Sequence, residues 1–203
     1  MIYVFFKFIL GPLILLFLRP VVYGRENLRV QGKAIFVSNH ISMADPMLLA
    51  LISPRIIHFM AKKEIFKSRL GNLFFRAMLA FPVNRRNADL QSLRIALKVL
   101  DKGKVFGIFP EGKRAVTEDL DEFEKGAAFL AVRSGAPLVP MYIHPGSYRS
   151  LHPRVIVGSP IQINSLSAGA NKSSLIDVVT DEIADAVSAL KEEMEMSFDN
   201  TNR

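Results

Sequence analysis

Short apolar runs alternate with helical patterns along most of this chain, and no other feature of the sequence restricts the possible fold as strongly. Each run is apolar at nearly every position, which is typical of strands buried on both faces of a sheet. The runs occupy residues 34–38, 55–60, 81–83, 105–109, 138–143 and 155–163. Buried strands that alternate with helices predict an α/β sandwich, in which helices flank a largely buried, mixed or parallel sheet.

Helical patterns fill the spaces between these runs. Residues 45–51 open with Asp45-Pro46, which favours a helix start with Asp45 as the N-cap. Further helices are expected at residues 62–80, 89–103, 123–134 and 175–194. The 203 residues suffice for one domain with a substantial core. We expect that domain over residues 24–198, a membrane-associated helical segment over residues 1–23 and a flexible tail over residues 199–203.

The N-terminal segment is strongly hydrophobic. Residues 2–18 read IYVFFKFILGPLILLFL, and these 17 residues are interrupted by Lys7 and by Gly11-Pro12. A spanning helix needs roughly 20 apolar residues, and Arg19-Pro20 follows in place of the small-residue cleavage site of a signal peptide. We interpret the segment as a monotopic anchor seated in one leaflet, with Lys7 and Arg19 at headgroup level. A single membrane span and a core helix are the alternatives.

Charge is unevenly distributed along the chain. Residues 1–114 hold 19 Lys and Arg against 6 Asp and Glu, whereas residues 115–203 hold 7 against 13. A basic half predicts an anionic partner, such as nucleic acid, anionic lipid or a phosphorylated substrate. We expect no nucleic acid partner, because the basic segments lack interleaved aromatic residues. The chain has no Cys, which excludes disulfides, thiolate zinc sites and a cysteine nucleophile.

The strand expected at residues 34–38 leads directly into Asn39 and His40, and Asp45 follows five residues after the histidine. If the loop folds back, the carboxylate can fix one ring nitrogen of His40 and leave the other free to accept a proton. This spacing predicts a general-base pair. The sequence offers it no nucleophile, because Cys and a Gly-x-Ser-x-Gly pattern are both missing. We expect no metal, because the four His residues show no paired-ligand spacing.

A second unusual strand exit is FPEGKR, residues 109–114. Gly112 would let the backbone approach a ligand, and Lys113 and Arg114 would suit a phosphate. Glu111 would meet a substrate hydroxyl or hold Arg114. The alternative is an ordinary turn with solvated charges. Arg85 belongs to a further basic pair that follows the run at residues 81–83, and surface charge is the simpler interpretation there.

Together these motifs resemble those of the glycerolipid acyltransferase family. NHISMAD, residues 39–45, matches the family's N-H-x-x-x-x-D motif, and FPEGKR matches its F-P-E-G-x-R motif. AFPVNRR, residues 80–86, resembles the second block, with Arg85 as its arginine, and LVPMYI resembles the fourth. The four blocks occur in order within about residues 30–160, and within the family the chain resembles bacterial 1-acyl-sn-glycerol-3-phosphate acyltransferases. Lys113 and Asn84 depart from the pattern, because Thr and Asp are common at those places.

The resemblance implies transfer of a fatty acyl group from acyl-CoA or acyl-acyl carrier protein to the free hydroxyl of lysophosphatidic acid. The product would be phosphatidic acid, made for phospholipid biosynthesis. His40 would be the general base and Asp45 would orient it, while the acceptor phosphate would be held by Arg85, Lys113 and Arg114 in a pocket shaped by Glu111 and Gly112. No bound cofactor is implied, since the acyl thioester is a co-substrate.

The implied partners are membrane phospholipid, lysophosphatidic acid and acyl carrier protein, and the implied location is the cytoplasmic face of the cell membrane. Several alternatives stay open. The acceptor could be another lysolipid or glycerol-3-phosphate. The protein could instead be a thioester or lipid hydrolase in which His40 activates water, or a membrane-binding protein without enzymatic activity.

Overall fold

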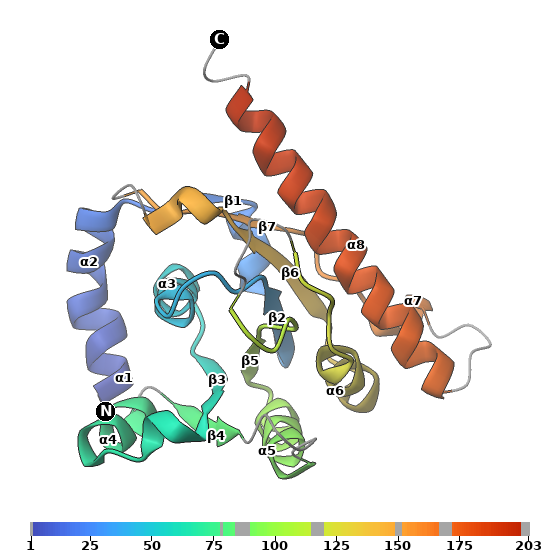
Figure 1. The fold of residues 1–203 in the computed structure, drawn as a ribbon, viewed down its shortest axis with the longest axis horizontal. Coiled ribbons are helices and arrows are strands. Elements are labelled where there is room, and N and C mark those ends of the chain that lie inside the picture. The colour runs from blue at the N-terminus through green and yellow to red at the C-terminus, as the bar shows by residue number, and fades with distance from the viewer. Residues whose placement is uncertain are drawn as a thin grey trace.

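Seven strands form one sheet in the structure, a computed structural model that describes residues 2–77, 79–83, 90–114, 120–148, 152–166 and 172–199. The strands are β1 (Val21–Tyr23), β2 (Ala34–Ser38), β3 (Ile57–Lys62), β4 (Ala80–Val83), β5 (Val105–Ile108), β6 (Leu138–Ile143) and β7 (Arg154–Val157). Their order across the sheet is β1-β7-β6-β2-β5-β3-β4 (Figure 1). Strands β6, β2, β5, β3 and β4 run parallel, β7 is antiparallel to β6, and β1 is parallel to β7. The expected mixed α/β sheet is confirmed.

The central strands are buried at every position, as their unbroken apolar sequences predicted. Strands β2 and β6 expose no residue, and Phe36 of β2 lies between Val139 of β6 and Gly107 of β5. Successive side chains point to opposite faces, so β2 contributes Ile35 to one hydrophobic cluster and Phe36 to the other. The helices that cover both faces account for the absence of any polar alternation in these strands.

One face of the sheet is covered by α5 (Leu90–Asp101), α6 (Gly126–Ser134) and α8 (Lys172–Asp199). Figure 1 shows α8 crossing this face as a long diagonal helix. The opposite face is covered by α3 (Asp45–Ile52) and by the N-terminal helices α1 (Ile2–Phe5), η1 (Phe6–Leu10) and α2 (Gly11–Leu18). The shorter helical segments are η2 (Arg25–Arg29), η3 (Lys63–Phe66), α4 (Arg69–Ala77), η4 (Pro145–Tyr148) and α7 (Ile163–Leu166).

Two stretches differ from their predicted structure. The helix expected at residues 62–80 is divided, because β3 extends to Lys62 and is followed by η3 and then α4. The run at residues 155–163, expected to hold one or two strands, contributes one strand that ends at Val157, after which Gly158 donates its N–H to the carbonyl of Pro140. Beyond it, Ile161 makes only an isolated antiparallel bridge with Leu138. Residues 200–203, most of the expected tail, lie outside the described residues.

The N-terminal helices pack on the domain through one face. Tyr3, Lys7 and Gly11 are buried, and the Tyr3 hydroxyl accepts a hydrogen bond from the N–H of Ile57 at 3.2 Å. The opposite face exposes large apolar side chains, namely those of Phe5, Phe8, Ile9, Leu10, Leu13, Leu16 and Phe17. Among the residues that the structure describes, no helix combines the length and apolar character that crossing a bilayer requires.

The predicted headgroup position of Lys7 is wrong. Its ammonium group donates to the carbonyl of Ala50 at 3.0 Å, in the last turn of α3, and to the carbonyl of Arg55 at 2.5 Å. Burial lowers the pKa of Lys7 to about 8. The polar interruption of the apolar segment is therefore explained by two carbonyl groups that receive a cation, one in the last turn of α3 and one in the segment that follows it.

Candidate active site

The carboxyl ends of β2, β5 and β6 lie next to one another in the sheet, and the site is built on the segments that leave them. Asn39 fixes the first of these exits. Its side-chain amide donates to the carbonyl of Ile143 at 2.9 Å and accepts the Ile143 N–H at 2.7 Å. Because this pair of bonds joins the exit of β2 to the end of β6, the following residue, His40, leaves the sheet at a fixed place.

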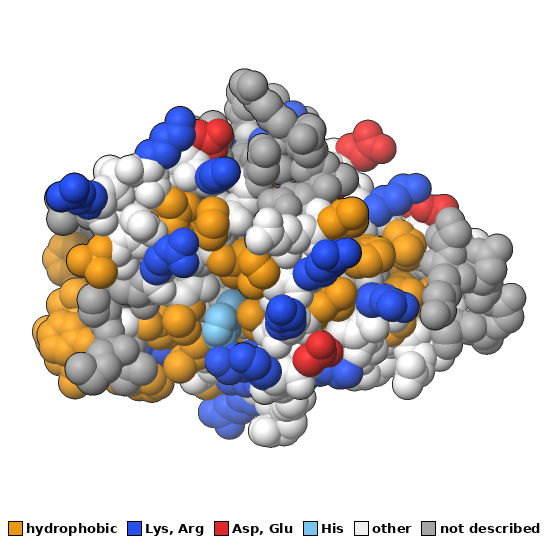
Figure 2. All heavy atoms as spheres, turned by 90° about the horizontal axis from the view of Figure 1, so that it is seen from below, with side chains coloured by type: hydrophobic (Ala, Val, Ile, Leu, Met, Phe, Trp, Pro, Cys, Tyr) orange, Lys and Arg blue, Asp and Glu red, His pale blue; other side chains and the backbone are white. Residues whose placement is uncertain are grey.

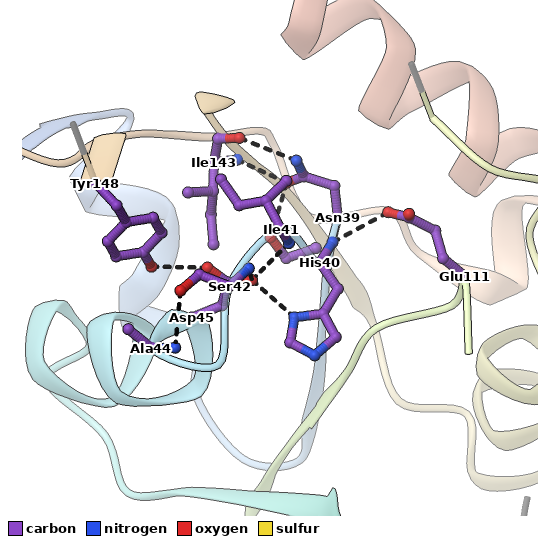
Figure 3. A network of polar contacts seen from close by, with 10 residues as sticks. Asn39, His40, Ile41, Ser42, Ala44, Asp45, Glu111, Ile143 and Tyr148 are labelled. Atoms are coloured by element: carbon purple, nitrogen blue, oxygen red, sulfur yellow. Dashed lines mark hydrogen bonds and ion pairs between the residues drawn. The ribbon is translucent and has the colours of Figure 1, made fainter. Parts of the chain in front are cut away.

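The loop after β2 folds back as its spacing predicted (Figure 3). Nδ1 of His40 lies 2.7 Å from Oδ2 of Asp45, and the same oxygen accepts the N–H groups of Ile41 at 2.7 Å and Ser42 at 2.8 Å. Asp45 is fully buried. A buried carboxylate is tolerated when donors surround it, so this loop is organised around Asp45.

Asp45 is not the N-cap that the sequence suggested. Helix α3 begins at Asp45 itself, and Ala44 occupies the cap position without a side-chain hydrogen bond. The carboxylate instead accepts the N–H groups of the preceding loop, because the imidazole and these amides lie on the side away from the helix. Its task is therefore to hold the loop and His40.

The imidazole of His40 is oriented on two sides. Asp45 holds Nδ1, and the ring stacks on Phe109 with centroids 4.2 Å apart and planes inclined by 19°. The side chain of His40 is 12% exposed, so it is reachable from outside. With Nδ1 engaged, Nε2 is the nitrogen that can exchange a proton with a bound molecule, which is the arrangement of a general base.

Glu111 connects the segment that follows β5 to the loop that follows β2. Its Oε1 accepts the backbone N–H of His40 at 3.1 Å, while its buried Oε2 has no hydrogen-bond partner among the described residues. Burial raises the pKa of Glu111 to about 7, and the negative charges of Asp121 and Asp45 act in the same direction. Near neutral pH this carboxyl group can therefore gain or lose a proton beside His40.

The remainder of the second exit is more open. Gly112 has φ +66°, and a Cβ there would lie 2.4 Å from Oε1 of Glu124, so glycine suits both the backbone and the space. Lys113 and Arg114 are exposed, and Nζ of Lys113 lies 3.4 Å from Oδ2 of Asp121. Arg85, the remaining predicted phosphate contact, lies outside the described residues.

Tyr148 is a member of the site that was not predicted from the sequence. This tyrosine of η4 donates its hydroxyl hydrogen to Oδ1 of Asp45 at 2.7 Å, and Figure 3 shows Asp45 between Tyr148 and His40. The only available signal was that PGSYR follows the run at residues 138–143. Its proximity to His40 depends on β6 being a neighbour of β2, which the sequence did not specify. In the described part of the chain, no group of three or more His, Asp and Glu side chains could hold a metal ion.

Comparison with known proteins places this chain in a family. The family model described as "Acyltransferase" matches residues 19–144. A 1-acyl-sn-glycerol-3-phosphate acyltransferase of Bacillus subtilis is 36% identical over 146 residues, which cover 69% of this chain and 72% of that protein. A protein of the same name from Borreliella burgdorferi is 29% identical, with 63% of this chain and 52% of that protein covered. The chain thus spans between half and three quarters of the length of these relatives.

A solved structure shares the fold. The 1-acyl-sn-glycerophosphate (LPA) acyltransferase PlsC from Thermotoga maritima superposes with a TM-score of 0.63 at 23% identity, covering 86% of this chain and 78% of that one. The matched family segment contains the β2 exit, the β5 exit and the strand between Leu138 and Ile143. The chain belongs to the acyltransferase family.

Proposed function

We propose that this protein transfers a fatty acyl group from an acyl thioester to the free hydroxyl of 1-acyl-sn-glycerol-3-phosphate, giving phosphatidic acid. The relatives named above carry this activity in their names. The observation that carries the proposal is the His40–Asp45 pair at the exit of β2, at 2.7 Å. Such a pair can activate an acceptor hydroxyl without a nucleophile of the enzyme, and the chain has no Cys.

In the proposed reaction, Nε2 of His40 removes the proton of the acceptor hydroxyl as its oxygen attacks the thioester carbonyl. Asp45 stabilises the imidazolium that forms and keeps the ring in place. The C–S bond then breaks, and the thiolate of coenzyme A or acyl carrier protein takes the proton from His40. The cycle ends with a new ester, a free thiol and the original neutral imidazole, and we propose that it uses no bound cofactor.

We propose that the exit of β5 binds the acceptor. Arg114 and Lys113 are exposed on this turn and can donate charged hydrogen bonds to the phosphate, and Arg85 is proposed as a third contact. Gly112 shapes the turn. Oε2 of Glu111 is buried without a partner in the described structure, which suits a hydrogen bond with a glycerol hydroxyl.

We further propose that the outer face of α1, η1 and α2 lies in the membrane interface, at the cytoplasmic side of the cell membrane. Figure 2 shows hydrophobic side chains gathered at the edge where these helices lie in Figure 1, and Lys and Arg side chains spread over the adjoining face. Leu13, Leu16 and Phe17 are 64%, 68% and 68% exposed, which water disfavours and a lipid surface accommodates.

The experiment that tests the activity is a matrix of the purified full-length protein against acceptors and donors, read by mass spectrometry. The acceptors are lysophosphatidic acid, glycerol-3-phosphate, lysophosphatidylcholine and none, and the donors are acyl-CoA and acyl-acyl carrier protein. We expect phosphatidic acid from lysophosphatidic acid in far larger amount than any other product. Free fatty acid released at the same rate with and without acceptor would identify a hydrolase and refute the proposal.

The membrane contact is tested by flotation with vesicles that contain anionic phospholipid. Leu13→Glu combined with Phe17→Glu should weaken binding at least about 100-fold, since each buried apolar side chain contributes roughly 1.5–3 kcal/mol. Met196→Glu is the matched control, because Met196 is 61% exposed on α8. Flotation of the double variant at the wild-type level would exclude this face as the membrane contact.

A further inference from the structure

We infer that Tyr148 is a positioning residue for the acyl transfer reaction, acting through Asp45 on His40. The inference rests on the proposed function, because it concerns the same base. Tyr148 lies beyond the residues that match the family model, which end at residue 144. It would extend the catalytic pair to three members, Tyr148, Asp45 and His40, in that spatial order (Figure 3).

The two carboxylate oxygens of Asp45 have different partners. Oδ2 faces His40 and two loop amides, with contacts of 2.7 to 2.8 Å. Oδ1 is held by the Tyr148 hydroxyl at 2.7 Å. With both oxygens bonded, the carboxylate cannot rotate about its own axis without losing a charge-assisted hydrogen bond. The hydrogen bond from Tyr148 therefore fixes the direction in which Oδ2 points, and with it the tilt of the His40 ring.

The protonation state of Tyr148 also suits a positioning role. Asp45 is fully buried, and the only cation that the described site brings to it is the imidazolium formed during the reaction. Burial, together with the neighbouring charge of Asp45, raises the pKa of Tyr148, so the phenol keeps its proton over the working range of pH. A neutral donor of this kind stabilises the carboxylate without competing for the proton that His40 transfers.

The location of Tyr148 points the same way. Its ring lines a mainly apolar cavity of about 250 Å³, together with Ile14 and Leu18 of α2 and Met47 of α3. The hydroxyl points inward to Asp45, although Tyr148 as a whole is 39% exposed. A tyrosine needed only to fill space would not have to direct its hydroxyl at a buried carboxylate.

Tyr148→Phe removes the hydroxyl and keeps the ring. We expect kcat to fall about 10-fold, the low end of what a hydrogen bond to a charged group provides, while KM for lysophosphatidic acid stays within about twofold of wild type. The acid limb of the kcat–pH profile should move to higher pH. A carboxylate that has lost one donor binds the imidazolium more tightly, so the base is freed only at higher pH. The charge of Glu111 also interacts with Asp45, but Glu111 is the same in both proteins and so does not account for a difference between them.

Tyr23→Phe is the matched control, because Tyr23 is an exposed tyrosine of β1 and the same atom is lost. It should leave kcat and the acid limb unchanged. A purely structural role for Tyr148 would lower the folded fraction without moving the acid limb, so an unmoved limb would overturn the inference. So would a kcat within about twofold of wild type, far less than a charged hydrogen bond provides.

A double-variant cycle supplies a second, independent test. In an Asp45→Asn background, Tyr148→Phe should cost no further activity, and the loss of melting temperature in the double variant should be smaller than the sum of the single losses. Additive losses in melting temperature would overturn the inference, even if the protein proved inactive. If the acceptor matrix shows that the protein uses another acceptor and not lysophosphatidic acid, the proposed function fails. The role of Tyr148 is then tested by the ratio of variant to wild-type kcat measured with that other acceptor.

Discussion

The two strand exits that build the site are organised in opposite ways. In the loop after β2, Asn39 and Asp45 are buried and each makes at least two hydrogen bonds. In the turn after β5, Lys113 and Arg114 face outward, and buried Glu111 carries an oxygen without a partner in the described structure. The first exit is complete without a ligand. The second exit has hydrogen-bond donors and one acceptor for which a ligand could supply partners.

This difference fits the different roles that we propose for the two exits. A general base must be held in place, because small displacements of a reacting group are costly in rate. A binding turn can be less constrained, since its charged groups gain partners when the substrate arrives. Substitutions in the β2 loop should therefore lower the rate of the chemical step, whereas substitutions in the β5 turn should change which acceptor is used.

The largest effect is expected from His40→Ala. Loss of a general base lowers rates by about 10²–10⁴-fold, and Asp45→Asn should be of similar severity because it disturbs the orientation of the ring. Initial rates and circular dichroism of the purified variants are the measurements. Ser42→Ala is the control within the same loop. In the described structure the Ser42 hydroxyl accepts the N–H of Ala44 at 3.2 Å and makes no hydrogen bond to His40 or Asp45. A folded His40→Ala protein that retained half of the wild-type rate would disprove the role of the base.

A smaller and more selective effect is expected at Arg114. A charged hydrogen bond contributes roughly 1.5–3 kcal/mol, so Arg114→Ala should lower kcat/KM for lysophosphatidic acid by about 10- to 150-fold and leave the donor KM nearly unchanged. Lys113→Thr should cost much less, because a hydroxyl can still donate to the phosphate and the Lys113–Asp121 ion pair is largely exposed.

The decisive comparison for Arg114 uses an acceptor without phosphate, such as a monoacylglycerol. Wild type should use it poorly, and Arg114→Ala should no longer distinguish it from lysophosphatidic acid. Equal losses on both acceptors would mean that Arg114 holds the turn rather than the phosphate. The contrast between the two exits would then be weaker than we describe.

The smallest effect on rate is expected from Glu111→Gln, which keeps the acceptor for the His40 N–H, and the signature of this variant lies in stability. The folded protein raises the pKa of Glu111 from 4.5 to about 7. The protonated carboxyl therefore stabilises the folded state below pH 4.5, and this contribution is lost as the pH rises through 7.

Chemical denaturation of both proteins between pH 4.5 and 8 measures this effect. Relative to Glu111→Gln, the wild-type free energy of unfolding should fall across that range, by at most about 3 kcal/mol at 1.36 kcal/mol per pKa unit. A difference between the two proteins that is constant with pH would show that folding does not raise the pKa of Glu111, and that this carboxyl group is as well accommodated as the polar groups of the first exit.

The local parts of the site could be predicted from the sequence. The limits of β2 and the return of Asp45 to His40 follow from a short apolar run and from short-range spacing, and the structure confirms both. The fold class followed in the same way, from apolar runs that are too uniform for a half-exposed sheet.

Contacts that join distant segments could not be predicted. Tyr148 reaches Asp45 across 103 positions of sequence, and Lys7 reaches Ala50 across 43. The sequence shows a cation inside an apolar helix but not the carbonyl groups that receive it. It also gave no reason to pair Val21 with Arg154, because β1 has only three residues and no alternation.

The burial of Lys7 has a consequence for anyone who wishes to handle this protein without lipid or detergent. Deleting residues 1–18 would remove the ammonium group of Lys7 and the hydroxyl group of Tyr3. The carbonyl of Ala50 and the N–H of Ile57 would then lose these hydrogen-bond partners. A form that needs no lipid or detergent should therefore be sought by replacing outward side chains, such as Phe8, Leu13 and Phe17, with polar ones, while Tyr3 and Lys7 are kept. The inner face of the N-terminal segment supports the domain, and only the outer face, which we propose to lie against lipid, can be altered without loss of these contacts.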